Sequence, residues 1–261
     1  MPIPFIDRPP TQGEFEKLRL LLSTFQDGTG QNHGGLKPGW RDFERVIAVL
    51  LDGEAVESKA IFDVQVPDPV NPAVKYGIAC KMRREMSYLD RTGKLTLELS
   101  NADKRFWAEL QRNGIDRANF RNHPDVVGRL IVRLVERWQN EVSTNNGGDI
   151  DLSKSSYFVL TYHPRTYTYI LHQLGLPIPD PDTLHWSYPS ESRLLGELNG
   201  EKLFEWYFNS GGQLKYYPRA DSAIWTSERF TLEPLPPDAE ANSVLAKAQA
   251  YFPVLWKHSN R

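Results

Sequence analysis

Cysteine and long apolar runs are scarce in this chain of 261 residues. Cys80 is the single cysteine, which excludes an intramolecular disulfide framework and a zinc site built from several thiolates. No apolar run approaches the ~20 residues that a membrane-spanning helix needs. The first four residues, Met-Pro-Ile-Pro, lack the basic and apolar regions of a signal peptide. We therefore expect no membrane partner and a cytoplasmic location.

Sequence motifs of several enzyme classes are also missing. No GxGxxG or GxxxxGK[ST] motif follows an apolar run, which argues against dinucleotide and P-loop chemistry. The GxSxG motif of many hydrolases is absent, and the six histidines show no metal-ligand spacing. An excess of one charge is missing too, because the net charge is −2. A nucleic-acid-binding surface would therefore have to be confined to one cleft.

The remaining composition is that of an ordinary globular protein, with 40% hydrophobic and 25% charged residues. Thr11 and Glu14 form a capping-box pattern, so we expect a helix over residues 11–26. Apolar residues at helical spacing predict further helices. These cover residues 40–51, 101–113, 123–142, 166–174 and 239–252.

Strands are expected where β-branched and apolar residues run between turn residues. They cover residues 60–66, 76–85, 94–99 and 156–162, with a turn at 91–93 between the second and third. Residues 175–189 are rich in proline and predict a loop. From residue 202 onward polar and aromatic residues alternate around Gly211-Gly212, which predicts a hairpin in a β-rich region.

This order of elements predicts an α/β (α+β) fold with a central mixed β-sheet flanked by helices. We expect residues 1–175 to form a core with N-terminal helices. Residues 176–261 then form a β-rich C-terminal extension with a terminal helix, packed on the core as one domain.

Two residues in the centre of the chain suggest metal-dependent hydrolysis of phosphate esters. Asp63 is the one acid in the apolar run 60–66, where an unpaired charge is costly. Lys81 lies at the polar end of the next run, so we expect its ammonium group near the Asp63 carboxylate. Mg²⁺ prefers one or two carboxylates together with water and substrate oxygens. The backbone carbonyl of Cys80 can add a further oxygen.

An aspartate on one strand followed by a lysine at the end of the next resembles the PD-(D/E)XK nuclease superfamily, whose best-known members are type II restriction endonucleases. The resemblance covers residues 40–113 and also rests on Glu44, which lies on the helix before the first of these strands. It implies a restriction-endonuclease-like core and a Mg²⁺-dependent, sequence-specific endonuclease. The implied substrate is double-stranded DNA, and the implied assembly is a homodimer.

The family pattern has an acidic residue two positions before the lysine, and this chain has Ala79 there. Glu98 and Glu85 are the candidates to replace that carboxylate. We favour Glu98, because a strand end holds a side chain more rigidly than a charged loop does. The expected catalytic set is thus Glu44, Asp63, Lys81 and Glu98, and the expected metal ligands are Asp63, Cys80 and Glu98.

Four arginines are candidates for contacts with DNA. Arg83 and Arg84 follow Lys81 closely and are expected beside the cleaved phosphate. Arg165 and Arg219 each lie in a turn next to aromatic residues, where arginine can reach a guanine edge.

Two other interpretations remain open from the sequence. A non-catalytic DNA-binding protein could be built on a decayed nuclease-like core in which Ala79 marks lost metal binding. An unrelated small-molecule enzyme could use Asp63 and Lys81 as a buried ion pair. Cleavage of DNA would favour the nuclease, and binding without cleavage would favour the DNA-binding protein. A protein that does neither would be the small-molecule enzyme.

Overall fold

The structure, a computed structural model, describes residues 2–27, 37–56, 61–235 and 252. Its central sheet has the strand order β1-β2-β3-β5-β6-β11, with β12 also pairing with β6. Strands β3 and β5 are parallel and the other neighbours are antiparallel, so the sheet is mixed. The strands are β1 (Glu54–Ala55), β2 (Val64–Pro67), β3 (Lys75–Arg83), β5 (Ser156–Tyr162), β6 (Thr168–Gly175), β11 (Trp225–Thr226) and β12 (Phe230–Thr231).

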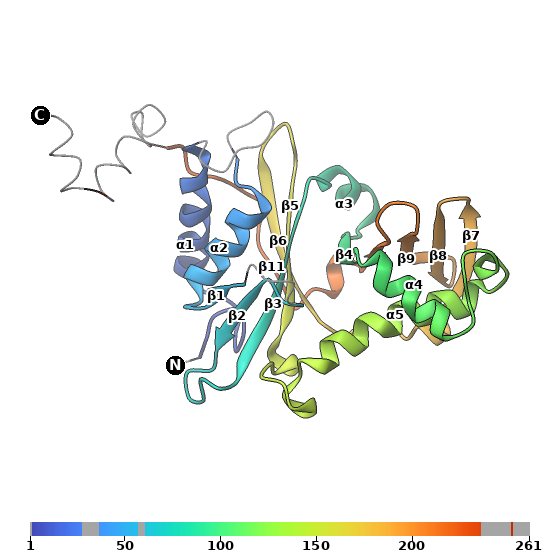
Figure 1. Ribbon diagram of the computed structural model, residues 1–261. Coiled ribbons are helices and arrows are strands. Elements are labelled where there is room, and N and C mark those ends of the chain that lie inside the picture. Colours follow the sequence, from blue (N-terminus) through green and yellow to red (C-terminus); the bar gives the residue numbers. More distant parts are fainter. Residues whose placement is uncertain (1, 28–36, 57–60, 236–251, 253–261) are drawn as a thin grey trace, which may run out of the picture.

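A second, antiparallel sheet lies beside the first, with the order β4-β10-β9-β8-β7 (Figure 1). Its strands are β4 (Leu97–Ser100), β7 (His185–Ser190), β8 (Arg193–Leu198), β9 (Glu201–Tyr207) and β10 (Gln213–Tyr216). The expected β-rich C-terminal region therefore exists, but it is completed by β4 from the middle of the chain.

Five α-helices surround the sheets in the described part of the chain: α1 (Gln12–Ser23), α2 (Trp40–Leu50), α3 (Met86–Thr92), α4 (Asp103–Arg112) and α5 (Pro124–Glu141). Short 3₁₀ turns are η1 (Thr24–Asp27), η2 (Phe120–Asn122), η3 (Thr144–Asn146), η4 (Leu152–Lys154), η5 (Pro181–Thr183) and η6 (Ala220–Ser222). Helices α1 and α2 cover the central sheet, whereas α4 and α5 extend along the second sheet (Figure 1). The predicted fold class, a mixed central sheet flanked by helices, is confirmed.

Each layer has its own apolar core. One core joins α1 and α2 to one face of the central sheet, and another joins α4 and α5 to the second sheet. A third core lies where the two sheets meet and includes Phe62, Ala79, Leu97 and Tyr157. None of the described helices is both long and apolar enough to cross a membrane.

The structure confirms the capping box at Thr11 and Glu14. It also confirms five of the predicted helices and strands, with ends shifted by a few residues: 11–26, 40–51, 76–85, 123–142 and 156–162. The helix expected over 101–113 is also present, as α4. In the part of the run 60–66 that the structure describes, residues 61–66, the strand begins at Val64. The terminal helix expected over 239–252 lies outside the described residues, except for Phe252.

The helix predicted over residues 166–174 is wrong, because this segment is strand β6. Its residues 169–175 pair with β5, and this ladder outweighs the local apolar spacing that suggested a helix. The proposed turn at 91–93 is the end of α3, where Gly93 takes a left-handed conformation with φ 66°. The proline-rich segment 175–189 contains a loop and most of β7, and β8 was not predicted.

Candidate active site

Asp63 directly precedes β2, at the point where the ladder between β2 and β3 ends at the pair Val64–Ile78. Beyond this pair the Cys80 amide of β3 has no backbone acceptor on β2. It donates instead to the Asp63 side chain, at Oδ2, over 2.7 Å. Phe62 fixes the approach, because its ring lies directly on Gly77, where any added Cβ would overlap it. The local sequence thus holds the carboxylate at one place on the edge of β3.

Lys81 lies next to this carboxylate. Its Nζ is 3.1 Å from Asp63 Oδ2, so the predicted proximity of the two groups is confirmed. Side chains alternate along β3: Ile78 and Cys80 belong to the core under α1 and α2, whereas Ala79 belongs to the core between the sheets. Lys81 therefore projects from the face that looks toward the second sheet.

Glu44 of α2 completes an electrostatic group with these residues. Partial burial and, second, the nearby Asp63 carboxylate raise its pKa from 4.5 to about 7. Lys81, Arg41 and Arg45 oppose this shift without cancelling it. No hydrogen bond or ion pair from the described residues engages the Glu44 carboxyl group. Two carboxyl groups thus lie near each other at a partly buried point of the fold.

These groups fit a divalent cation by their donor chemistry. The Cys80 amide points toward Asp63, and in an extended strand the carbonyl of a residue points to the same edge as its amide. Asp63, Glu44 and the Cys80 carbonyl therefore supply the oxygens that Mg²⁺ prefers. Burial raises the pKa of the Cys80 thiol, which keeps the sulfur protonated and unsuited to hold a metal. Over the described ranges no three His, Cys, Asp or Glu side chains converge closely enough to form a metal cluster by themselves.

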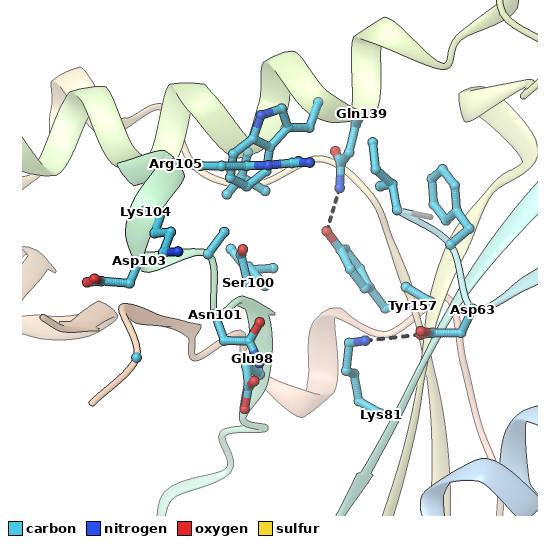
Figure 2. A pocket seen from close by; sticks show the side chains of 18 residues that line it. Asp63, Lys81, Glu98, Ser100, Asn101, Asp103, Lys104, Arg105, Gln139 and Tyr157 are labelled. Carbon is cyan, nitrogen blue, oxygen red and sulfur yellow. Dashed lines mark hydrogen bonds and ion pairs between the residues drawn. The ribbon is translucent and has the colours of Figure 1, made fainter. Parts of the chain in front are cut away.

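A cavity of about 770 Å³ opens above Asp63 and Lys81, between the two sheets. Figure 2 shows the Lys81–Asp63 pair on one side and Glu98, Ser100 and Asn101 on the opposite wall. Helix α5 contributes Trp138 and Gln139, and the start of α4 contributes Lys104 and Arg105. In size and in its mixture of aromatic and polar groups the cavity resembles sites that hold small ligands.

Tyr157 lines this cavity and was not foreseen from the sequence. The register of β3 with β5 puts it beside Ala79, the position where the nuclease pattern has an acid. The small alanine leaves the space that the tyrosine ring and the cavity use. The Gln139 side-chain amide donates to the Tyr157 hydroxyl at 2.7 Å. Ala79 and Tyr157 lie 78 residues apart in the chain, and the pairing of β3 with β5 brings them together.

Glu98 lines the same cavity, as expected, but it lies on β4 of the second sheet rather than on a strand of the central sheet. Its Oε2 accepts from Arg83 at 3.3 Å and from the Gln213 side-chain amide at 2.7 Å. Among these described side chains, no hydrogen bond or ion pair joins Glu98 to Asp63 or Lys81. Glu85, the other candidate, directly precedes α3 and is not part of the cavity wall.

The four arginines proposed to contact DNA lie in different settings. Arg83 is half-buried and bound to Glu98, and its Nε has no partner among the described groups. Arg84 and Arg165 are exposed. Arg219 is exposed but engaged by Asp221 through a contact of 2.8 Å. Only Arg83 is linked to a residue of the cavity wall through a contact described above.

Comparison of the chain with models of protein families, with curated proteins and with solved structures finds no match. The interpretation of the site therefore depends on its own geometry.

Proposed function

We propose that this protein is a Mg²⁺-dependent endonuclease of the PD-(D/E)XK type that hydrolyses phosphodiester bonds of double-stranded DNA at a specific sequence. The observation that carries the proposal is the contact of Asp63 with both the Cys80 amide and the Lys81 ammonium group, at 2.7 and 3.1 Å. Glu44, with its pKa raised to about 7, provides the second carboxyl group. A cytoplasmic homodimer is part of this proposal.

In this function Asp63, Glu44 and the Cys80 carbonyl would hold the metal ion. When bound, Mg²⁺ lowers the pKa of a water molecule and stabilises negative charge on the phosphate. Lys81 orients the attacking water and neutralises a phosphate oxygen. The attacking water would give up a proton to solvent as its oxygen forms a bond to phosphorus, one ester P–O bond would break, and the leaving oxygen would take a proton from solvent. Glu98 faces the reaction from the opposite wall and holds Arg83 there.

The test is incubation of the purified protein with a mapped plasmid, with and without Mg²⁺. We expect discrete fragments only with Mg²⁺, and a loss of at least about 100-fold in cleavage rate for Asp63→Asn. A matched control exists on the same strand, because Lys75 of β3 forms an ion pair of 2.8 Å with Asp149. Asp149→Asn removes a similar ion pair outside the site and is expected to cleave normally.

Cleavage by Asp63→Asn at the wild-type rate would contradict the proposal. Binding of DNA without cleavage would instead support a non-catalytic DNA-binding protein. Ala79 favours this second function, because it removes a carboxylate from the position where the nuclease pattern has one. If the protein neither binds nor cleaves DNA, the ion pair of Asp63 and Lys81 would belong to an unrelated small-molecule enzyme.

A further inference from the structure

The cavity above Asp63 and Lys81 is too small for a duplex and too large to serve a phosphate alone. Its volume of about 770 Å³ lies in the range of sites that enclose a ligand of the size of a nucleotide. The Asp63–Lys81 pair lies at its floor, so a strand whose phosphate reaches this pair can place the attached base in the cavity. This inference rests on the proposed nuclease function.

The inner end of the cavity carries an unused donor and an unused acceptor side by side. Burial raises the pKa of the Tyr157 hydroxyl to about 12, so this group keeps its proton at neutral pH. It accepts from the Gln139 amide, and no acceptor for its own proton is found in the part of the chain that the structure describes. The Gln139 carbonyl oxygen likewise receives no hydrogen bond from the described groups. The edge of every nucleobase offers a donor and an acceptor that such a pair can match.

The walls supply flat surfaces for stacking. Trp138 is half-buried in the cavity wall, and the Arg105 guanidinium lies 5.3 Å from the centre of its ring. Phe62 and Tyr157 also line the cavity, but both are buried, at 2% and 4% exposed, so Trp138 and Arg105 supply the accessible stacking surface. Proteins hold unstacked bases on aromatic rings and arginine planes of this kind.

The charges of the wall make the binding of an anionic ligand dependent on a cation. Three carboxylates, Asp63, Glu98 and Asp103, face three cations, Lys81, Lys104 and Arg105. The wall by itself is therefore close to neutral and attracts a phosphate weakly. A divalent cation bound at Asp63 and Glu44 would make the net charge of the site positive and so strengthen the binding of a phosphate.

We propose that this cavity holds one nucleotide of a DNA strand whose base has left the stack, with the base bound by Tyr157 and Gln139. Fully paired DNA must then unpair and unstack a base before it fits, whereas DNA with an unpaired base does not bear this cost.

The experiment measures the binding of three fluorescent probes by anisotropy, in Ca²⁺ and in EDTA. The probes are a random-sequence duplex, the same duplex with one unpaired base, and the single strand; gels confirm that they stay intact. We expect the wild-type protein in Ca²⁺ to bind the two probes with unpaired bases at least about tenfold more tightly than the paired duplex. EDTA is expected to weaken the binding of all three.

Two single-atom variants on one strand test the residues. Tyr157→Phe removes the hydroxyl in the cavity and should weaken the binding of the unpaired probes about fivefold. Tyr162→Phe is the matched control, because Tyr162 is also buried on β5 but belongs to the core under α1 and α2. It should bind like the wild type.

Equal affinity for paired and unpaired probes, or an unchanged preference in Tyr157→Phe, would overturn the inference. So would displacement of the probe by equimolar free deoxynucleoside monophosphates, since the ligand would then be a free nucleotide. These results are independent of the plasmid assay. Plasmid cleavage without the preference contradicts the base site alone, and the preference without cleavage contradicts the nuclease function alone.

Discussion

Glu44 and Asp63 show how two ordinary carboxyl groups become a site. Each is common as a residue type, but the fold partly buries Glu44 and, second, brings it near Asp63, and both effects raise the pKa of Glu44. Lys81 is bound to Asp63 and offsets only part of this repulsion. The folded chain therefore stores an electrostatic cost at this point, which a bound cation would relieve.

The first prediction concerns the stability at different pH values. Glu44 has a pKa of about 7 in the folded chain against an ordinary value of 4.5, so its protonated form is favoured by folding. This contribution to stability is complete below pH ~4.5 and is lost as the pH rises through about 7. When the pH rises from 5 to 8, the unfolding free energy of the wild type should therefore fall by about 1 to 3 kcal/mol more than that of Glu44→Gln. Urea denaturation at the two pH values measures this difference.

The control for this prediction is Glu54→Gln, which changes an exposed glutamate on β1. Its stability should follow the wild type at both pH values. The same dependence on pH in Glu44→Gln and in the wild type would show that Glu44 is not perturbed. In the proposed nuclease, the deprotonation of Glu44 also predicts that metal binding strengthens as the pH rises through about 7.

At the scale of elements, the Glu98 carboxylate links β3 to β4. Glu98 of β4 accepts from Arg83 at the end of β3 and from Gln213 of β10. The carboxylate thus connects the central sheet to two strands of the second sheet. Glu85 has no comparable place, since it precedes α3 outside the cavity wall.

The second prediction compares these two glutamates. Glu98→Gln should lower plasmid cleavage at least about tenfold under saturating Mg²⁺, because it removes a charge from the cavity and releases Arg83. Glu85→Gln should change the rate less than about threefold, as expected of a residue outside the site. Measured rates of the two variants under the same conditions decide between them. The opposite ranking would assign the role to Glu85.

At the scale of the whole molecule, the cavity depends on how α5 and the second sheet are held together. Gly128 of α5 and Gly196 of β8 both lie against the Trp186 ring of β7, so closely that a Cβ at either position would overlap it. Trp186 is 1% exposed and belongs to the core of the second sheet. The same helix carries Trp138 and Gln139 into the cavity. The packing around Trp186 therefore sets the position of one cavity wall.

The third prediction follows from this packing. Gly128→Ala should reduce the free energy of unfolding by about 1 to 3 kcal/mol, because the added methyl group has no space. Gly13→Ala is the matched control: Gly13 lies in α1 with nothing near its Cβ position, and alanine favours a helix over glycine. It should leave stability unchanged or raise it slightly. Thermal unfolding compares both variants with the wild type, and an equally stable Gly128→Ala would contradict the packing argument.

Much of the fold could be predicted because local signals agreed with the final environment. Helix α1 starts at its capping box, and β5 is a continuous apolar run buried along its whole length. The contact between Asp63 and Lys81 also followed from two neighbouring strands and their turn. Residues 166–174 failed for the opposite reason, since their apolar spacing suits a helix while their partner β5 imposes a strand.

The sequence alone determined the contacts between groups that lie close together in the chain. An acid before β2 and a lysine near the end of β3 are placed together by one hairpin and by strand alternation. The tertiary structure alone decided what surrounds them. Tyr157 reaches Ala79 through the parallel pairing of β3 and β5, and Gln139 reaches Tyr157 from α5. Such contacts depend on the register of distant elements, and no local pattern of residues encodes that register.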